Sequence, residues 1–159
     1  RADGALEKLP DAAAEVELGV SLWRQKRLTE AREHLEKAVA LAPTNADAQN
    51  NLGVVLGQLG DFAGAQRCFI AAVKADPLFA RARFNLALSY VDAKKDQAAI
   101  ASFEELLRMK YDEDKVHFHY GRVLFRAGRS REAKEHLEQA LKINPAFKEA
   151  AELLKRVKE

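Results

Sequence analysis

Residues 46–79 read ADAQNNLGVVLGQLGDFAGAQRCFIAAVKADPLF, and this pattern recurs at a constant interval along the chain without a gap. The pair Leu52-Gly53 has three counterparts, Leu18-Gly19, Leu86-Ala87 and Tyr120-Gly121. The small residue Ala65 has the counterparts Ala31, Ala99 and Ala133, and the large residue Phe69 has Leu35, Phe103 and Leu137. Agreement at this many positions predicts a repeat protein whose units share one structure.

Each unit contains two blocks of apolar residues at helical spacing, separated by a short polar break such as Leu59-Gly60-Asp61. This spacing predicts a helical hairpin in every unit. The small residues let the two helix backbones approach closely. Pro43, Pro77 and Pro145 lack the amide hydrogen needed to continue the second helix. Tyr111 stands where the third unit would have its proline, so that helix either runs on past Met109 or packs at a different angle.

The composition is that of a soluble globular chain, with 159 residues, 48% hydrophobic residues, and 26 Lys and Arg against 24 Asp and Glu. No stretch has the roughly 18 consecutive apolar residues that a membrane span needs. The single cysteine, Cys68, excludes an internal disulfide and a thiolate metal site. Because the first residue is not Met, we interpret the chain as a processed or excised piece. The cytoplasm is favoured among compartments.

The repeat resembles the tetratricopeptide repeat, whose signature combines a small residue after Leu, an aromatic or Leu three positions on, and then Ala, Phe, Ala and Pro across a helix-turn-helix unit. The resemblance implies an all-α fold, a right-handed α-solenoid of stacked antiparallel hairpins. We expect one domain with repeats at 12–45, 46–79, 80–113 and 114–147, followed by a capping helix at 148–159. Residues 1–11 are expected to be the end of a preceding helix.

The same resemblance implies that the first helices line a concave groove that binds a partner peptide or helix. Its positions carry over to Val20, Trp23, Asn50, Asn51, Val54, Arg81, Phe84, Asn85, Leu88, Lys115, Phe118, His119, Arg122 and Arg126. Asn51 and Asn85 occupy the same position of successive repeats and resemble the asparagines by which family members hold a peptide backbone. We expect Phe84 and Phe118 to receive apolar side chains.

The charge distribution predicts an acidic group in the partner. Residues 114–159 contain 11 Lys or Arg against 7 Asp or Glu, whereas residues 46–79 contain 2 against 3. Arg122 and Arg126 are four residues apart on one helical face, and Arg81 precedes them in the neighbouring helix, so together they can receive a carboxylate. The predicted partner is therefore a protein or peptide with apolar anchors and an acidic group.

Catalysis finds no support in the sequence, because no nucleophile and base fall together. His117 and His119 point about 200° apart on a helix, so no metal site is predicted, and neither is a cofactor. Basic residues are mixed with acids, which argues against nucleic-acid binding. The expected function is a non-catalytic protein-interaction scaffold. Two alternatives stay open, namely a scaffold that self-assembles into homo-oligomers and a substrate-docking module of a larger enzyme.

Overall fold

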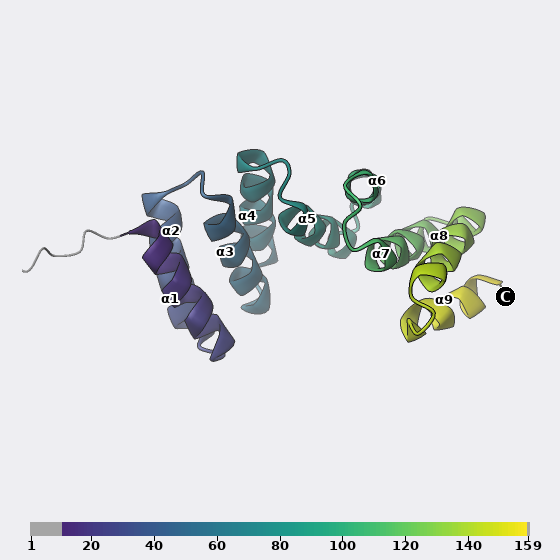
Figure 1. The fold of residues 1–159 in the computed structure, drawn as a ribbon, viewed down its shortest axis with the longest axis horizontal. Helices are drawn as coiled ribbons and strands as arrows, with labels where there is room; N and C mark the ends of the chain where they lie inside the picture. Colours follow the sequence, from purple (N-terminus) through teal and green to yellow (C-terminus); the bar gives the residue numbers. More distant parts are fainter. Residues whose placement is uncertain (1–10, 159) are drawn as a thin grey trace, which may run out of the picture. The chain divides into compact units, whose positions relative to one another are not determined.

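The computed structural model describes residues 11–158, and these form nine helices joined by short turns (Figure 1). In chain order the helices are α1 Ala12–Arg24, α2 Leu28–Leu41, α3 Ala46–Gln58, α4 Phe62–Ala75, α5 Ala80–Asp92, α6 Asp96–Arg108, α7 Glu113–Arg126, α8 Ser130–Ile143 and α9 Lys148–Lys158. The expected all-α solenoid of helical hairpins is confirmed. The expectation of a helix end within residues 1–11 lies almost wholly outside the described residues.

The chain divides into two compact units, Arg1–Ala82 and Arg83–Glu159, with the boundary inside α5. In unit 1, α1 packs on α2 and α3, and α3 packs on α4. In unit 2, α7 packs on α6, α8 and α9. Within the described part of the chain, no helix is both long and apolar enough to cross a lipid bilayer.

Close helix packing explains the glycine of the repeat. A Cβ added to Gly53 of α3 would lie 2.6 Å from Cε1 of Phe69 on α4, and one added to Gly19 of α1 would lie 2.6 Å from Cγ of Leu35 on α2. Leu35 is fully buried and Phe69 is 7% exposed, so neither side chain has room to move away. The small residue of each first helix and the large residue of each second helix therefore fit together as one packing unit.

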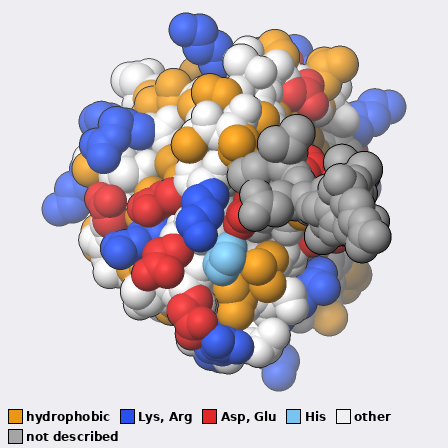
Figure 2. Space-filling model, turned by 90° about the vertical axis from the view of Figure 1, so that its left-hand side faces the viewer, with side chains coloured by type: hydrophobic (Ala, Val, Ile, Leu, Met, Phe, Trp, Pro, Cys, Tyr) orange, Lys and Arg blue, Asp and Glu red, His pale blue; other side chains and the backbone are white. Residues whose placement is uncertain are grey.

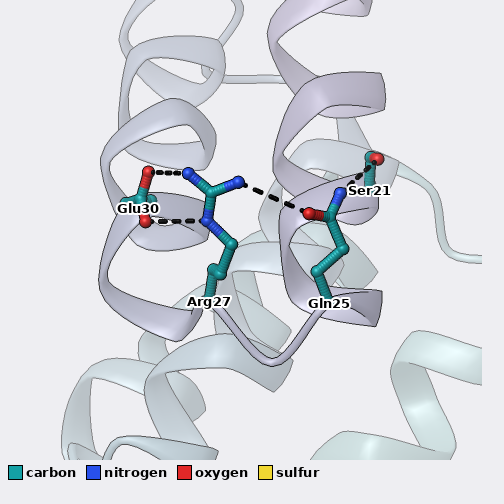
Figure 3. A network of polar contacts seen from close by, with 4 residues as sticks. All are labelled: Ser21, Gln25, Arg27 and Glu30. Atoms are coloured by element: carbon teal, nitrogen blue, oxygen red, sulfur yellow. Dashed lines mark hydrogen bonds and ion pairs between the residues drawn. The ribbon is translucent and has the colours of Figure 1, made fainter.

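The turns inside the hairpins need a left-handed residue after the first helix. Gly60 (φ 88°) and Gly128 (φ 79°) take this conformation without strain, whereas Lys26 (φ 64°) and Lys94 (φ 56°) take it in the other two hairpins. Figure 3 shows how the first of these turns is tied together by polar side chains. Arg27 donates from Nε and Nη2 to the Glu30 carboxylate at 2.9 and 2.5 Å, and from Nη1 to Gln25 Oε1 at 3.4 Å.

The segment at Tyr111 does not extend the preceding helix. Helix α6 ends at Arg108, and the amide of Tyr111 donates to the Leu106 carbonyl at 3.1 Å. Lys110 (φ 53°) and Asp112 (φ 42°) adopt left-handed backbone conformations, so the chain turns there without a proline. The possibility that this helix runs on past Met109 is therefore wrong. The Tyr111 ring instead packs on Phe84, with ring centroids 6.0 Å apart.

Helix α9 covers the end of the last hairpin. Ala150 and Leu153 of α9 pack in one core cluster with Leu137 and Ala140 of α8. The exposed residues of its last turn are basic, Lys155, Arg156 and Lys158. This combination of an apolar inner face and a charged outer face is what an open stack of repeats requires at its end.

Candidate partner-binding surface

In unit 1, the expected binding residues of α1 and α3 are partly or wholly engaged in packing. Trp23 is half-buried beside the core cluster of Leu22, and its Nε1 donates to Gln58 Oε1 at 2.9 Å, which links α1 to α3. Val20, Asn51 and Val54 are also half-buried. Asn50 is only 2% exposed, so its side chain is buried, which differs from the surface position expected for a partner-binding residue.

Arg81 belongs to unit 1 and is engaged there. Its Nη2 lies 3.7 Å from Oδ1 of Asp47, and its guanidinium carbon lies 5.6 Å from the centre of the Phe79 ring. Both side chains of the ion pair are more than half exposed, so the pair contributes little to stability. Arg122 and Arg126 belong to unit 2.

In unit 2, an aromatic cluster joins α5 to α7. The ring of His119 lies 5.7 Å from Phe84 of α5 and 5.0 Å from Phe118, its neighbour on α7. All three side chains are half-buried, so Phe84 and Phe118 serve packing and still expose part of their rings. Burial, followed by the charges of Arg122 and Lys115, lowers the pKa of His119 to about 4. His119 is therefore neutral at pH 7 and adds no positive charge to this surface.

The remaining expected residues of unit 2 lie on the same two helices. Asn85 and Leu88 are half-buried on α5. Lys115 is exposed at the start of α7, where its Nζ lies 3.0 Å from Oδ2 of Asp112. This pair raises the pKa of Lys115, which keeps the ammonium charged but engages it locally.

Three arginines surround a cavity of about 370 Å³ formed by α5, α7 and α9. The cavity is lined by Val91, Arg122, Val123, Phe125, Arg126, Leu153 and Arg156. Val91, Val123 and Leu153 are buried, so they provide an apolar floor beneath the guanidinium groups. The lining therefore places aliphatic side chains next to guanidinium groups.

The arginines of the cavity differ in how far they are already engaged. Arg126 donates from Nη1 to the Val91 carbonyl at 3.1 Å and from Nη2 to the carboxylate of Asp96, so its charge is compensated. Arg122 stacks over the Phe118 ring at 5.8 Å, and Arg156 stacks over Phe125 at 5.9 Å. Neither Arg122 nor Arg156 forms an ion pair with any carboxylate in the described part of the chain. Arg122 Nη1 also lies 3.3 Å from Nδ1 of His119, so this guanidinium group is hydrogen-bonded although no carboxylate among the described residues faces it.

Arg156 is not among the residues that the sequence predicts for binding. Leu88, Arg122 and Arg156 occupy the same position of successive repeats once the register is continued into the capping helix. Extending the repeat register in this way would have identified Arg156. The charged end of α9 is instead predicted only as a solvated cap.

The described residues offer few side chains that could act as a nucleophile or as metal ligands. Burial raises the pKa of the Cys68 thiol to about 11, so the thiol stays protonated at neutral pH. No group of three or more His, Cys, Asp or Glu residues lies together in a way that could hold a metal ion, within residues 11–158.

Models of the tetratricopeptide repeat match residues 11–77, 47–114 and 114–147. Protein FlbA of Caulobacter vibrioides is 32% identical over 136 residues, which are 84% of this chain and 22% of FlbA. The chain spans about a fifth of the length of the curated relatives that it matches.

Two solved structures share the fold. The crystal structure of MamA has a TM-score of 0.86 at 19% identity and covers 92% of this chain and 80% of MamA. That of YrrB, described as a TPR protein with an unusual peptide-binding site, has a TM-score of 0.83 at 22% identity and covers 91% of this chain and 74% of YrrB. At this level of identity the two likenesses show the fold alone.

Proposed function

The chain belongs to the tetratricopeptide repeat family, and we propose that it is a non-catalytic protein-interaction module that binds a partner segment with apolar anchors and an acidic group. The observation that carries this proposal is the cavity of unit 2, where Arg122 and Arg156 stand over an apolar floor without an ion-pair partner among the described residues. A desolvated apolar side chain next to a charge-assisted hydrogen bond is a common basis of peptide recognition.

The rest of the proposed surface lies on the first helices of the repeats, α3 in unit 1 and α5 and α7 in unit 2. In unit 2, Phe84 and Phe118 present the half-exposed edges of the aromatic cluster to apolar side chains of the partner. Asn85 and, in unit 1, Asn51 have amide groups that can both donate to and accept from a peptide backbone. Val54 offers a further apolar contact on α3. Each unit therefore contributes its own part of the proposed recognition.

Display of random peptides against the folded domain tests this function. We expect the enriched peptides to carry Asp or Glu next to an aliphatic or aromatic residue. Arg122→Glu or Arg156→Glu should weaken their binding about tenfold or more, which corresponds to about 1.4 kcal/mol and to the loss of one charge-assisted hydrogen bond. Arg131→Glu, which alters an exposed arginine of α8 outside the cavity lining, is the matched control. Enriched peptides without acidic residues, or equal binding by all variants, would contradict the proposal.

Self-association is a second candidate, favoured by apolar side chains that unit 1 leaves in solvent. Leu18 of α1 is 44% exposed, and Leu41 of α2 is 47% exposed. Figure 2 shows a face of the protein with hydrophobic side chains between charged side chains of both signs. Sedimentation velocity over a hundredfold concentration range separates the candidates. A mass that rises with concentration and falls back in Leu18→Lys would favour self-association, whereas a monomer throughout excludes it.

The role of a docking module for a larger enzyme also stays a prediction. The sequence of the full-length protein tests it, because a catalytic domain would have to lie outside residues 1–159.

A further inference from the structure

Two of the hairpins place polar side chains opposite one another at the same pair of repeat positions, 19 apart in the sequence. In the hairpin of α1 and α2 these are Glu15 and His34, whose Oε2 and Nδ1 lie 2.6 Å apart. In the hairpin of α7 and α8, three repeats later, they are His117 and His136, whose Nδ1 atoms lie 2.8 Å apart. The last hairpin therefore holds two imidazoles whose Nδ1 atoms face each other across the two helices.

The two imidazoles are held in place but remain accessible. Both side chains are half-buried, and their ring centroids lie 5.1 Å apart with the rings tilted by 32°. The ring of Tyr120 packs on His136 at 4.0 Å, and its hydroxyl donates to Oε1 of Glu104 at 3.0 Å. Tyr120 thus fixes His136 from one side, while the exposed part of the pair can be reached from solvent.

We propose that His117 and His136 form a binding site for a late first-row divalent metal ion, such as Zn²⁺, Cu²⁺ or Ni²⁺. Neutral imidazole is a preferred ligand for these ions, with a metal–nitrogen distance of about 2.0–2.1 Å for Zn²⁺. Two nitrogens on one tetrahedral ion at that distance stand roughly 3.3 Å apart. The Nδ1 atoms therefore need to separate by only about half an ångström, which small rotations of the two rings provide.

Both imidazoles can bind the metal ion without losing or gaining a proton. In the pair as it stands, one Nδ1 must carry the proton that it shares with the other Nδ1. When the metal takes that place, this proton moves to Nε2 of the same ring, so both Nδ1 lone pairs face the ion. Each ring remains neutral, and water completes the coordination of an open site with two protein ligands.

Glu113 adds negative charge beside His117, whereas the carboxylate beside His136, Glu132, is paired with Arg129. Glu113 and Glu132 each lie four residues before one of the histidines, one helical turn away, and each acts electrostatically on that histidine. Glu132 is held by Arg129 through hydrogen bonds of 2.7 and 2.6 Å, so we assign the protein ligands to the two imidazoles alone.

NMR titration with ZnCl₂ tests the site directly, because the chain has four histidines and Zn²⁺ is diamagnetic. We expect the imidazole carbon-bound proton resonances of His117 and His136 to shift together and to saturate at one ion per chain. Those of His34 and His119 should stay in place. His117→Gln and His136→Gln should each weaken Zn²⁺ binding about tenfold or more in calorimetry. Glutamine retains hydrogen-bonding groups, and circular dichroism verifies that each variant is folded.

The equivalent pair in the first hairpin provides matched variants. His34→Gln and Cys68→Ala should leave Zn²⁺ affinity unchanged. Glu15→His places a second imidazole opposite His34 in the same register, and it should raise the stoichiometry from one ion to two. The proposal is overturned if His117→Gln and His136→Gln bind as tightly as the wild type, if the shifts fall on His34 or His119 instead, or if Cys68→Ala weakens the binding.

Discussion

Two glycines on α3 allow the packing of the hairpin to be tested with one chemical change. The first is Gly53, where an added Cβ would lie 2.6 and 2.8 Å from Cε1 and Cδ1 of Phe69. The second is Gly57, where an added Cβ would lie 3.7 Å from the Cβ of Ala65, an ordinary contact. We therefore predict that Gly53→Ala destabilises the domain and that Gly57→Ala stabilises it.

The change in unfolding free energy has two contributions of opposite sign, one from helix propensity and one from steric overlap. Replacing Gly by Ala inside a helix is worth about 0.5–1 kcal/mol of stability at either position. Overpacking a core adds a penalty of about 1–3 kcal/mol, and this applies at Gly53 because Phe69 is only 7% exposed. Because the helix term is shared, the difference between the two variants isolates the steric term. We expect Gly53→Ala to be less stable than Gly57→Ala by about 1–3 kcal/mol.

Urea unfolding monitored by circular dichroism at 222 nm measures this difference. In a thermal scan followed by the same signal, each kcal/mol should move the midpoint by about 2–4 °C in a domain of this size. Equal stability of the two variants would refute the close packing of α3 on α4, and so would a more stable Gly53→Ala.

Three further predictions rest on single positions. Lys94→Gly should stabilise the domain by about 1 kcal/mol, which urea unfolding would show as a higher midpoint. The reason is that Lys94 has a left-handed backbone (φ 56°), a conformation that the equivalent residue Gly60 adopts without backbone strain. Burial raises the pKa of the Cys68 thiol to about 11, so its reaction with iodoacetamide should be slow at pH 8 and faster as the pH approaches 11. In urea the thiol should react at the rate of an ordinary thiol, and mass spectrometry measures all three rates. Gln58→Ala removes the hydrogen-bond acceptor of the indole N–H of Trp23, the single tryptophan, and should lower the free energy of unfolding by about 0.5–1.5 kcal/mol. The fluorescence spectrum of Trp23 should shift as well, and an unchanged spectrum would contradict the contact.

The helices and their packing are readable from the sequence because the repeat specifies them four times over. The small residue at Gly53 and the large residue at Phe69 predict a close contact, and the structure confirms it. The end of α6 is different, because Tyr111 removes the proline signal. There the chain turns through the left-handed conformations of Lys110 and Asp112, and Lys is a residue type that gives no signal for such a conformation.

The candidate site is only partly readable, because groove positions carried over from a family do not specify rotation about each helix. Asn50 is buried, whereas its neighbour Asn51 is half-buried. Arg126 is compensated by Asp96, a residue far from it in the sequence whose proximity only the fold reveals. Arg156 could have been predicted, because the repeat register relates it to Arg122. The contact of His117 with His136 is revealed only by the structure, as is the equivalent contact of Glu15 with His34.

The proposed function requires a partner carboxylate to bind at Arg122 and Arg156. The most direct measurement follows the Nε–H resonances of these arginines by NMR while two blocked peptides are added separately, one with an aromatic residue followed by glutamate and one with glutamine in its place. The two peptides have nearly the same shape and differ in one negative charge. We predict that the glutamate peptide shifts both arginine resonances and that the glutamine peptide shifts them far less. Equal shifts with both peptides, or shifts with neither, would contradict the account.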